Sequence, residues 1–585
     1  MTPVLKRRIK GGWLPALAVV LFFSGAAGAQ TATGYFNKGV DCYEAKDYGC
    51  AIENLTKVIG ISPDDYEAYF FRGLSKLNKE EVVSSMEDFG KVIELKPDFY
   101  KAHFFRGIAL LGKNEYQKAI KDFDSTIELK PDYNKAYFQR GLAKFLLEDY
   151  RACIPDFTEY LAFNPDDAEA IFNRGVAKKN TGDFKGAISD YDKVIAQNPE
   201  DAAALFNRGF VRLNTGDMKG ALEDLDRAVK NDPQNNDALY FRGFTLVNLN
   251  EYEKAIIDFG IVIQNDPEHS KAYVNRGVAN RYTGRDEAAL DDFSQAIRID
   301  PKDAEAYYNR GIVRDKMGNY NEAITDYNDA LRLHPDDAET YYNRALSKRK
   351  TGDYTGTIED CSKAVEINPG FSQPYYLRGI SKFETEDNEG ALEDFTKSIE
   401  LDPKNPHPYL CRGMIRKKNN DFIGAIRDFD VAISIDPEYA SAFNYRGNSE
   451  YKITLYEQAI RDYDKALQLT PDDPKIHYNR GLAKYEAGDF DGAIKDYTIA
   501  VELDKTLSGA YKNRAIILYE QNKYKDAIED FNKALKLQPD WLDALNSRGA
   551  CKFMLKDEKG ACEDWKQAWD NGLDLARQNY IRCCE

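Results

Sequence analysis

The sequence predicts an all-α protein built as a solenoid of stacked helix pairs. The dipeptide Arg-Gly, or a near copy of it, returns every 34 residues from Lys38-Gly39 to Arg548-Gly549, with no insertion or deletion. Small residues recur at two places in the same frame, and proline recurs at a third. A fixed period of this length is typical of helix–turn–helix repeats. Sixteen such units fit the chain, the first beginning at residue 32.

Each unit carries signals for two closely packed helices. With Ala32 as position 1, position 8 is Gly in fourteen units and Ala in two, and position 20 is Ala in thirteen. Small residues at these places let two antiparallel helices approach each other. Position 24 is mostly aromatic, as in Phe89 and Tyr191, and fills the space between units. Position 32 is Pro in fourteen units, which ends the second helix before the next unit begins.

This pattern resembles the tetratricopeptide repeat family, whose repeat has an aromatic residue at position 4, Gly at 8, Ala at 20, an aromatic residue at 24 and Pro at 32. The resemblance covers residues 32 to about 573. It implies a right-handed superhelix whose first helices line a concave groove, with positions 2, 5, 6, 9, 12 and 13 facing it. We therefore expect a solenoid over residues 30–573 and a capping helix over 574–585, where Leu573, Ala576 and Tyr580 share one face.

The first 29 residues differ from the repeats. Four basic residues between positions 6 and 10 precede an apolar run from Trp13 to Phe23, and small residues end the segment at Ala27-Gly28-Ala29. This order is typical of a secretory signal peptide with Gln30 as the new N-terminus. An uncleaved anchor in the inner membrane is the alternative, although the apolar run is short for a span. We expect a periplasmic or secreted protein with no membrane span after cleavage.

Six of the nine cysteines lie in the first unit or after residue 550. An exported protein can oxidise them, and the end units of a solenoid have one neighbour instead of two. Cys42 and Cys50 flank the turn of the first unit, and Cys551 and Cys562 flank that of the last, so we expect these two pairs to be disulfides. Buried free thiols are the alternative, and the adjacent Cys583-Cys584 offers a link to another chain.

Composition and motifs exclude several classes of function. The net charge is −17, and it becomes −21 without residues 1–29, which hold four cations and no acid. An acidic chain argues against nucleic acid as a partner. No cysteine and histidine pattern indicates a metal site, and no phosphate-binding or nucleophile motif appears, so we expect no cofactor and no catalytic residue. His103 and His477 occupy position 4, where an aromatic residue normally packs.

One departure from the family pattern involves charge. Position 7, usually Leu, is Arg in fifteen units, and position 23 is Asp in the same fifteen. The first unit lacks both and has Lys38 and Asn54 instead. Position 11 is Lys or Arg in ten units and shares a helical face with position 7. A repeated ladder of ion pairs explains the matched Arg and Asp better than a basic stripe for an anionic ligand, which remains the alternative.

The candidate ligand site lies along the expected groove. Aromatic residues recur at position 5, asparagines at position 6, and two basic pairs occupy positions 12 and 13. Aromatic faces suit apolar side chains or a sugar ring, and an amide suits a peptide backbone. Packing between first helices is the alternative for position 5. The candidate residues are Phe70, Phe104, Phe138, Phe172, Phe206, Asn173, Asn207, Asn275, Asn309, Asn343, Arg349, Lys350, Lys417 and Lys418.

These observations favour an exported scaffold without catalytic activity that binds a protein or peptide in the groove. A structural spacer or assembly factor of the cell envelope is a second hypothesis, and a binder of saccharide or peptidoglycan is a third.

Overall fold

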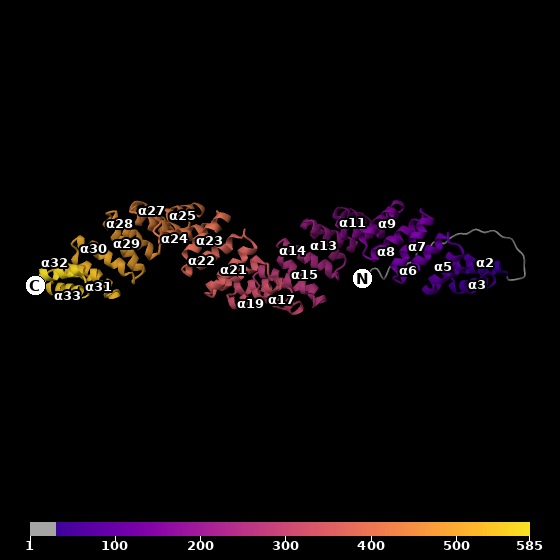
Figure 1. Cartoon of the computed structure of the whole chain (residues 1–585), viewed down its shortest axis with the longest axis horizontal. Coiled ribbons are helices and arrows are strands. Elements are labelled where there is room, and N and C mark those ends of the chain that lie inside the picture. The colour runs from indigo at the N-terminus through magenta and orange to yellow at the C-terminus, as the bar shows by residue number, and fades with distance from the viewer. Residues whose placement is uncertain (1–30, 585) are drawn as a thin grey trace. The chain divides into compact units, whose positions relative to one another are not determined.

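A computed structural model describes residues 31–584. The expected signal peptide, residues 1–29, lies outside the described residues. Every regular element in the described range is an α-helix, and these helices form two compact units, one ending at Arg285 and the other beginning at Asp286. In each unit the helices follow one another as antiparallel pairs (Figure 1), and each pair is one repeat of the sequence.

In the first unit, even-numbered helices are the first helices of their repeats and odd-numbered helices the second. The first helices are α2 (Ala32–Glu44), α4 (Tyr66–Asn78), α6 (Tyr100–Gly112), α8 (Asn134–Leu146), α10 (Ala168–Asn180), α12 (Ala202–Asn214), α14 (Asn236–Asn248) and α16 (Ser270–Tyr282). The second helices are α3 (Tyr48–Ile61), α5 (Val82–Leu95), α7 (Tyr116–Leu129), α9 (Tyr150–Phe163), α11 (Phe184–Gln197), α13 (Met218–Asn231) and α15 (Tyr252–Asn265).

The second unit opens with the second helix of repeat 8 and closes with one additional helix. Its first helices are α18 (Ala304–Lys316), α20 (Ala338–Lys350), α22 (Ser372–Glu384), α24 (Pro406–Lys418), α26 (Ala440–Lys452), α28 (Pro474–Glu486), α30 (Ser508–Glu520) and α32 (Leu542–Met554). The others are α17 (Asp286–Ile299), α19 (Tyr320–Leu333), α21 (Tyr354–Ile367), α23 (Asn388–Leu401), α25 (Phe422–Ile435), α27 (Tyr456–Leu469), α29 (Phe490–Leu503), α31 (Tyr524–Leu537), α33 (Glu558–Asp570) and α34 (Asp574–Cys584).

The turn inside each repeat has one conformation throughout the described chain. Position 15 has a positive φ in all sixteen repeats, and it is Gly in six of them. Its left-handed conformation ends the first helix. In repeat 5, Gly182 has φ +84°, and the carboxylate of Asp183 then accepts a hydrogen bond from the Gly186 amide at 3.0 Å. That bond caps the second helix.

Small and large side chains meet where the two helices of a repeat cross. A Cβ atom added to Gly311 would lie 2.7 Å from the ring of Tyr327, so the ring leaves no room for a side chain at position 8. In repeat 10, where position 8 is Ala345, position 24 is the small residue Cys361, and both are fully buried. In repeat 10 the larger residue at position 8 is thus matched by a smaller one at position 24.

The Arg and Asp of positions 7 and 23 form the ladder expected from the sequence. In the fourteen repeats whose two partners lie within one unit, an arginine nitrogen lies 2.5–2.7 Å from the aspartate. The contact is bidentate. In repeat 9, Arg310 donates from Nε and from Nη2 to the Asp326 carboxylate, which is 1 % exposed. Two parallel donors suit a buried carboxylate.

The basic residue at position 11 joins the same carboxylate. All ten Lys or Arg residues at this position lie 2.7–2.9 Å from the aspartate of their own repeat. Burial alone would raise the pKa of Asp496, but hydrogen bonds from Arg480 and Lys484 bring it below its ordinary value. The cations at positions 7 and 11 are therefore structural, and the alternative of a basic stripe for a ligand is not supported.

The same arginines also connect successive repeats. The remaining guanidinium nitrogen, Nη1, donates to the residue at position 25 of the preceding repeat in thirteen repeats. Arg208, for example, donates to Asp192 at 2.6 Å, and Arg310 donates to Ser294 at 3.1 Å. One side chain thus holds together the two helices of its own repeat and the second helix of the repeat before it.

The two ends of the repeat array carry disulfides, one as expected and one not. Cys42 is bonded to Cys50 across the turn of repeat 1. The expected Cys551–Cys562 pair is wrong, because Cys562 is bonded to Cys584 and Cys551 is a buried free thiol. Cys584 lies on α34, whose Ala576 is fully buried and whose Tyr580 packs on the last repeat. This helix covers the apolar end of repeat 16 and brings Cys584 to Cys562.

Repeat 13 keeps the Arg446–Asp462 pair but has an acid where ten other repeats have a cation. Position 11 is Glu450, which is 9 % exposed and whose Oε2 has no hydrogen-bond partner in the described structure. Burial, and next the carboxylate of Asp462, raise the pKa of Glu450 from 4.5 to about 8. The folded state therefore keeps a proton that the unfolded chain releases near pH 4.5. The free energy of unfolding must fall as the pH rises through this interval.

We predict that Glu450→Gln removes this pH dependence and raises the stability at pH 9 by an amount on the order of a few kcal/mol. Glu450→Lys should stabilise repeat 13 at least as much, because it restores the cation found in ten other repeats. Thermal unfolding of each variant at about pH 5 and pH 9 measures the effect. Glu457→Gln, an exposed glutamate on α27, is the control. An unchanged pH dependence in Glu450→Gln would show that this carboxyl does not titrate as described.

Candidate functional site

The outward side chains of the first helices form the surface on which the sequence placed the ligand site. We call positions 2, 5, 6, 9, 12 and 13 of the first helices the first-helix face. Most neighbouring first helices also contact one another, whereas no comparable packing joins successive second helices within either unit of the described chain. A stack with this difference bends towards its first helices. Within each unit, the first-helix face therefore lies on the inside of the bend.

The aromatic residues of position 5 are less accessible than a ligand platform requires. Phe70 and Phe104 are each 6 % exposed, while Phe138, Phe172 and Phe206 are half-buried. The ring of Phe104 lies 5.9 Å from that of Phe123, the position 24 residue of its own repeat. Phe70, Phe138 and Phe172 make the same contact at 5.9–6.1 Å.

The prediction that Phe70 and Phe104 offer ring faces to a ligand is therefore wrong. Besides the position 24 contact, Phe70 packs edge to face on Phe99 and Phe104 on Tyr133, each at 5.0 Å, and this second ring removes them from solvent. Phe70 and Phe104 instead follow the alternative given for position 5, because they pack inside the solenoid. Phe138, Phe172 and Phe206 share part of this packing and keep part of their surface exposed.

The asparagines of position 6 also serve the fold. Asn275 donates to the hydroxyl of Tyr240 at 3.2 Å, and Asn343 donates to that of Tyr308 at 3.0 Å, each across one repeat boundary. Asn207 accepts from Lys179 of the preceding repeat at 2.8 Å. Asn173 and Asn309 are 7 % and 6 % exposed. Most of the amide groups that we expected to meet a peptide backbone are thus buried or engaged within the protein.

The basic residues of positions 12 and 13 differ from those of the ladder. Arg349 and Lys417 are half-buried, and Lys350 and Lys418 are exposed. The Lys417 ammonium lies 5.0 Å from the centre of the Tyr445 ring, and that of Lys418 lies 5.6 Å from the centre of the Phe383 ring. Among the salt bridges of the described residues, none involves these four cations. They are the part of the predicted site that the fold leaves available.

Family comparisons agree with the repeat architecture. Models described as "TPR repeat" match residues 279–318 and 455–488. Models described as "Tetratricopeptide repeat" match residues 304–337, 508–540, 85–134, 172–236, 474–507, 338–371 and 372–405. Together these matches cover more than half of the chain. The chain belongs to the tetratricopeptide repeat (TPR) family. Members of this family are protein-interaction scaffolds and are generally not catalytic.

Solved structures of other TPR proteins are similar to parts of this one. MamA is 26% identical over 29% of this chain and 93% of its own, at a TM-score of 0.28. YrrB, described as a TPR protein with an unusual peptide-binding site, is 23% identical over 32% of this chain and 95% of its own, at a TM-score of 0.30. Yeast Tom70 is 18% identical over 73% and 97%, at a TM-score of 0.30. No curated protein matches this TPR chain in sequence.

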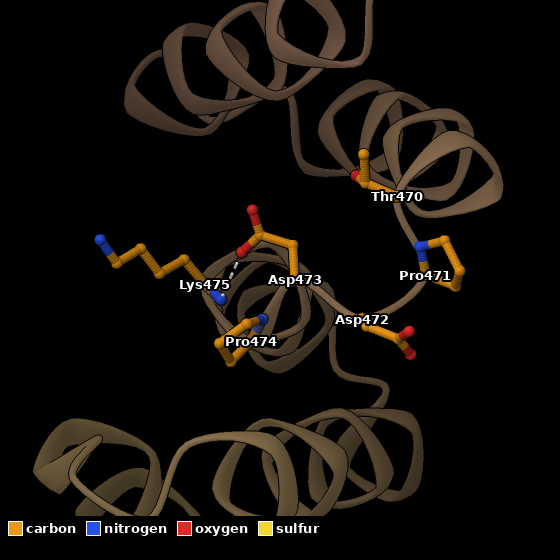
Figure 2. A pocket seen from close by; sticks show the side chains of 6 residues that line it. All are labelled: Thr470, Pro471, Asp472, Asp473, Pro474 and Lys475. Carbon is orange, nitrogen blue, oxygen red and sulfur yellow. Dashed lines mark hydrogen bonds between the residues drawn. The ribbon is translucent and has the colours of Figure 1, made fainter.

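The surface hollow in Figure 2 belongs to a turn of this TPR protein. It has a volume of about 500 Å³ and is lined by residues 470–475, between α27 and α28. The Asp473 carboxylate folds back and accepts a hydrogen bond from the Lys475 amide at 2.8 Å, while Asp472 and Lys475 point in opposite directions (Figure 2). Asp473 caps the N-terminus of α28, and the other lining side chains do not point towards a common centre. The hollow is therefore the surface of a helix start and not a ligand site.

Other titratable groups of this TPR chain have structural neighbours. His103 and His477 at position 4 place Nε2 3.2 Å and 2.9 Å from the carbonyl oxygens of Pro97 and Pro471. Across the described residues, no group of three or more His, Cys, Asp or Glu side chains is arranged to hold a metal ion. No helix in the described part of the chain is long and apolar enough to cross a membrane.

The first-helix face also includes residues that our sequence analysis did not single out. Phe210 at position 9 and Phe241 at position 6 are half-buried, and their rings meet edge to face at 4.9 Å. Tyr445 at position 6 lies beneath Lys417. The sequence could have identified them, because they occupy positions 6 and 9, which face the groove in the family pattern. Our attention to position 5, where aromatic residues recur most regularly, missed them.

Proposed function

We propose that this TPR protein is an exported, non-catalytic scaffold that binds a segment of a partner protein on its first-helix face. The observation that supports the proposal is that some cations of the first helices are paired with acids and others are not. The cations of positions 7 and 11 are paired with buried aspartates. Those of positions 12 and 13 in repeats 10 and 12 have no ion-pair partner among the described residues, and the two in repeat 12 lie beside aromatic rings. A surface that combines rings and unpaired charges is suited to contact a protein.

We predict that a photo-crosslinking phenylalanine analogue at Phe210 or Tyr451, both on the first-helix face, captures a partner in intact cells. The same analogue at Phe163 or Phe490 should not, although these second-helix residues are 58% and 41% exposed. Mass spectrometry of the adducts measures the difference. Equal capture from both helix types would contradict the proposal, and an absence of adducts at Phe210 and Tyr451 would favour a structural spacer. Glycan adducts would indicate a saccharide binder.

The proposed location is the periplasm or the exterior of the cell, with retention in the inner membrane as the alternative. The order of basic, apolar and small residues over 1–29 supports export. Two disulfides, at opposite ends of the repeats, support an oxidising compartment.

We expect the protein isolated from its native cells without reductant to begin at Gln30. After unfolding it should expose five reactive thiols, those of Cys153, Cys361, Cys411, Cys551 and Cys583. N-terminal sequencing and alkylation followed by mass spectrometry test both points, and reduction before alkylation is the control that reveals all nine cysteines. An intact Met1 would contradict cleavage, and nine reactive thiols without reductant would contradict export into an oxidising compartment.

A further inference from the structure

We propose that first helices α20, α22, α24 and α26 bind an acidic segment of the partner polypeptide, with the guanidinium group of Arg349 and the ammonium group of Lys417 meeting its carboxylates. This inference rests on the proposed function, because it names the chemistry of the segment that the first-helix face receives.

Five cations gather on the first-helix face of these repeats. We define the basic cluster as Arg349, Lys350, Lys417, Lys418 and Lys452, all at positions 12 or 13 of repeats 10, 12 and 13. None of these five cations has a carboxylate within ion-pair distance in the described structure, although Glu339 and Glu384 lie on the same face. In the same repeats, Arg344, Arg412 and Arg446 are each paired with a buried aspartate.

Arg349 has a donor that the fold does not satisfy. Its Nε is shielded from solvent and has no hydrogen-bond partner within the described chain. A shielded donor without an acceptor is unfavourable, and more so when it is charged. A carboxylate is the acceptor that matches a guanidinium group best, since it takes two parallel hydrogen bonds. The terminal nitrogens of Arg349 are not shielded in the same way. An acidic side chain placed against them would compensate the positive charge that the fold leaves without an acid.

Lys417 also lacks an acidic partner. Its ammonium group lies over the ring of Tyr445, which favours a cation without neutralising it. Burial, and next the charge of Lys452, lower the pKa of Lys417. A carboxylate beside the ammonium group would oppose both effects. Lys417 therefore gains from an anionic neighbour that the protein itself does not provide.

The arrangement favours a polypeptide over other anions. Arg349 and Lys417 occupy the same position two repeats apart, so one small ion cannot serve both, whereas an extended segment with separated acids can. The rings of Phe383 and Tyr445 lie beside the cations and suit apolar side chains between those acids. The net charge of −17 opposes a long polyanion such as nucleic acid.

The test uses the full chain and fluorescein-labelled peptides of alternating glutamate and leucine, eight residues long, in fluorescence anisotropy. We expect binding that weakens as salt is raised and that falls roughly tenfold or more in the double variant Arg349→Gln/Lys417→Gln. The control Lys363→Gln/Lys397→Gln removes the same charge from exposed positions on α21 and α23 and should bind normally. Arg349→Lys/Lys417→Arg should retain most of the affinity.

Several outcomes would overturn the inference. A peptide of alternating glutamine and leucine that binds equally well would show that carboxylates are not recognised. Normal binding by the double variant would remove Arg349 and Lys417 from the site. Tighter binding of a phosphoserine–leucine peptide or of single-stranded DNA would assign the cluster to phosphate. If the double variant does not fold, Lys350→Gln/Lys418→Gln changes only exposed residues. It should weaken binding roughly threefold, and unchanged affinity would contradict the proposal.

The two proposals fail in different ways. Photo-crosslinks from Phe210, in the first unit, do not depend on the basic cluster. If these crosslinks persist while the glutamate–leucine peptide does not bind, the first-helix face receives a protein without the acidic preference. If both signals are absent, the proposed function fails together with the inference.

Discussion

Fifteen of the sixteen repeats bury an aspartate at position 23, and that carboxylate is tolerated because the arginine at position 7 donates hydrogen bonds to it. A buried charge without a partner is strongly destabilising, so neither residue can be lost alone. Repeat 1 illustrates the constraint, because it has replaced both, with Lys38 exposed and Asn54 hydrogen-bonded to the Cys50 carbonyl. The third arginine nitrogen reaches the preceding repeat. The ladder therefore determines both the geometry within a repeat and the contact between repeats.

The ladder also separates structural cations from available ones. Positions 7 and 11 face the seam between the two helices of a repeat, and their charge is neutralised there. Positions 12 and 13 turn away from that seam and lie on the first-helix face. The charge of Lys417 at position 12 lies over the Tyr445 ring of the next repeat and has no ion-pair partner among the described residues. Lys316 at position 13 is paired with Asp286. The cations of the basic cluster, which have no such pair, are the ones available to a partner.

Much of this architecture could be predicted from the sequence because it is periodic. Glycine at position 8, proline at position 32 and the Arg–Asp pair of positions 7 and 23 indicate contacts that recur in nearly every repeat. The Cys42–Cys50 bond could be predicted because both residues flank the same short turn, whose geometry is that of the repeat. The Cys562–Cys584 bond did not, because it depends on how α34 folds back onto repeat 16, a contact that occurs once. The burial of Phe70 and Phe104 depends on neighbouring rings, such as Phe99 and Tyr133, that vary between repeats.

The central claim is that the Arg–Asp pair is a buried structural contact, and a double-mutant cycle on Arg310 and Asp326 tests it most directly. Hydrogen exchange of the amides in α18 and α19 reports the local stability of repeat 9 in the variants Arg310→Met, Asp326→Asn and the double change. The account predicts that each single change destabilises the repeat by about 3–5 kcal/mol and that the double change costs at least about 1 kcal/mol less than their sum. Small, additive effects would contradict it.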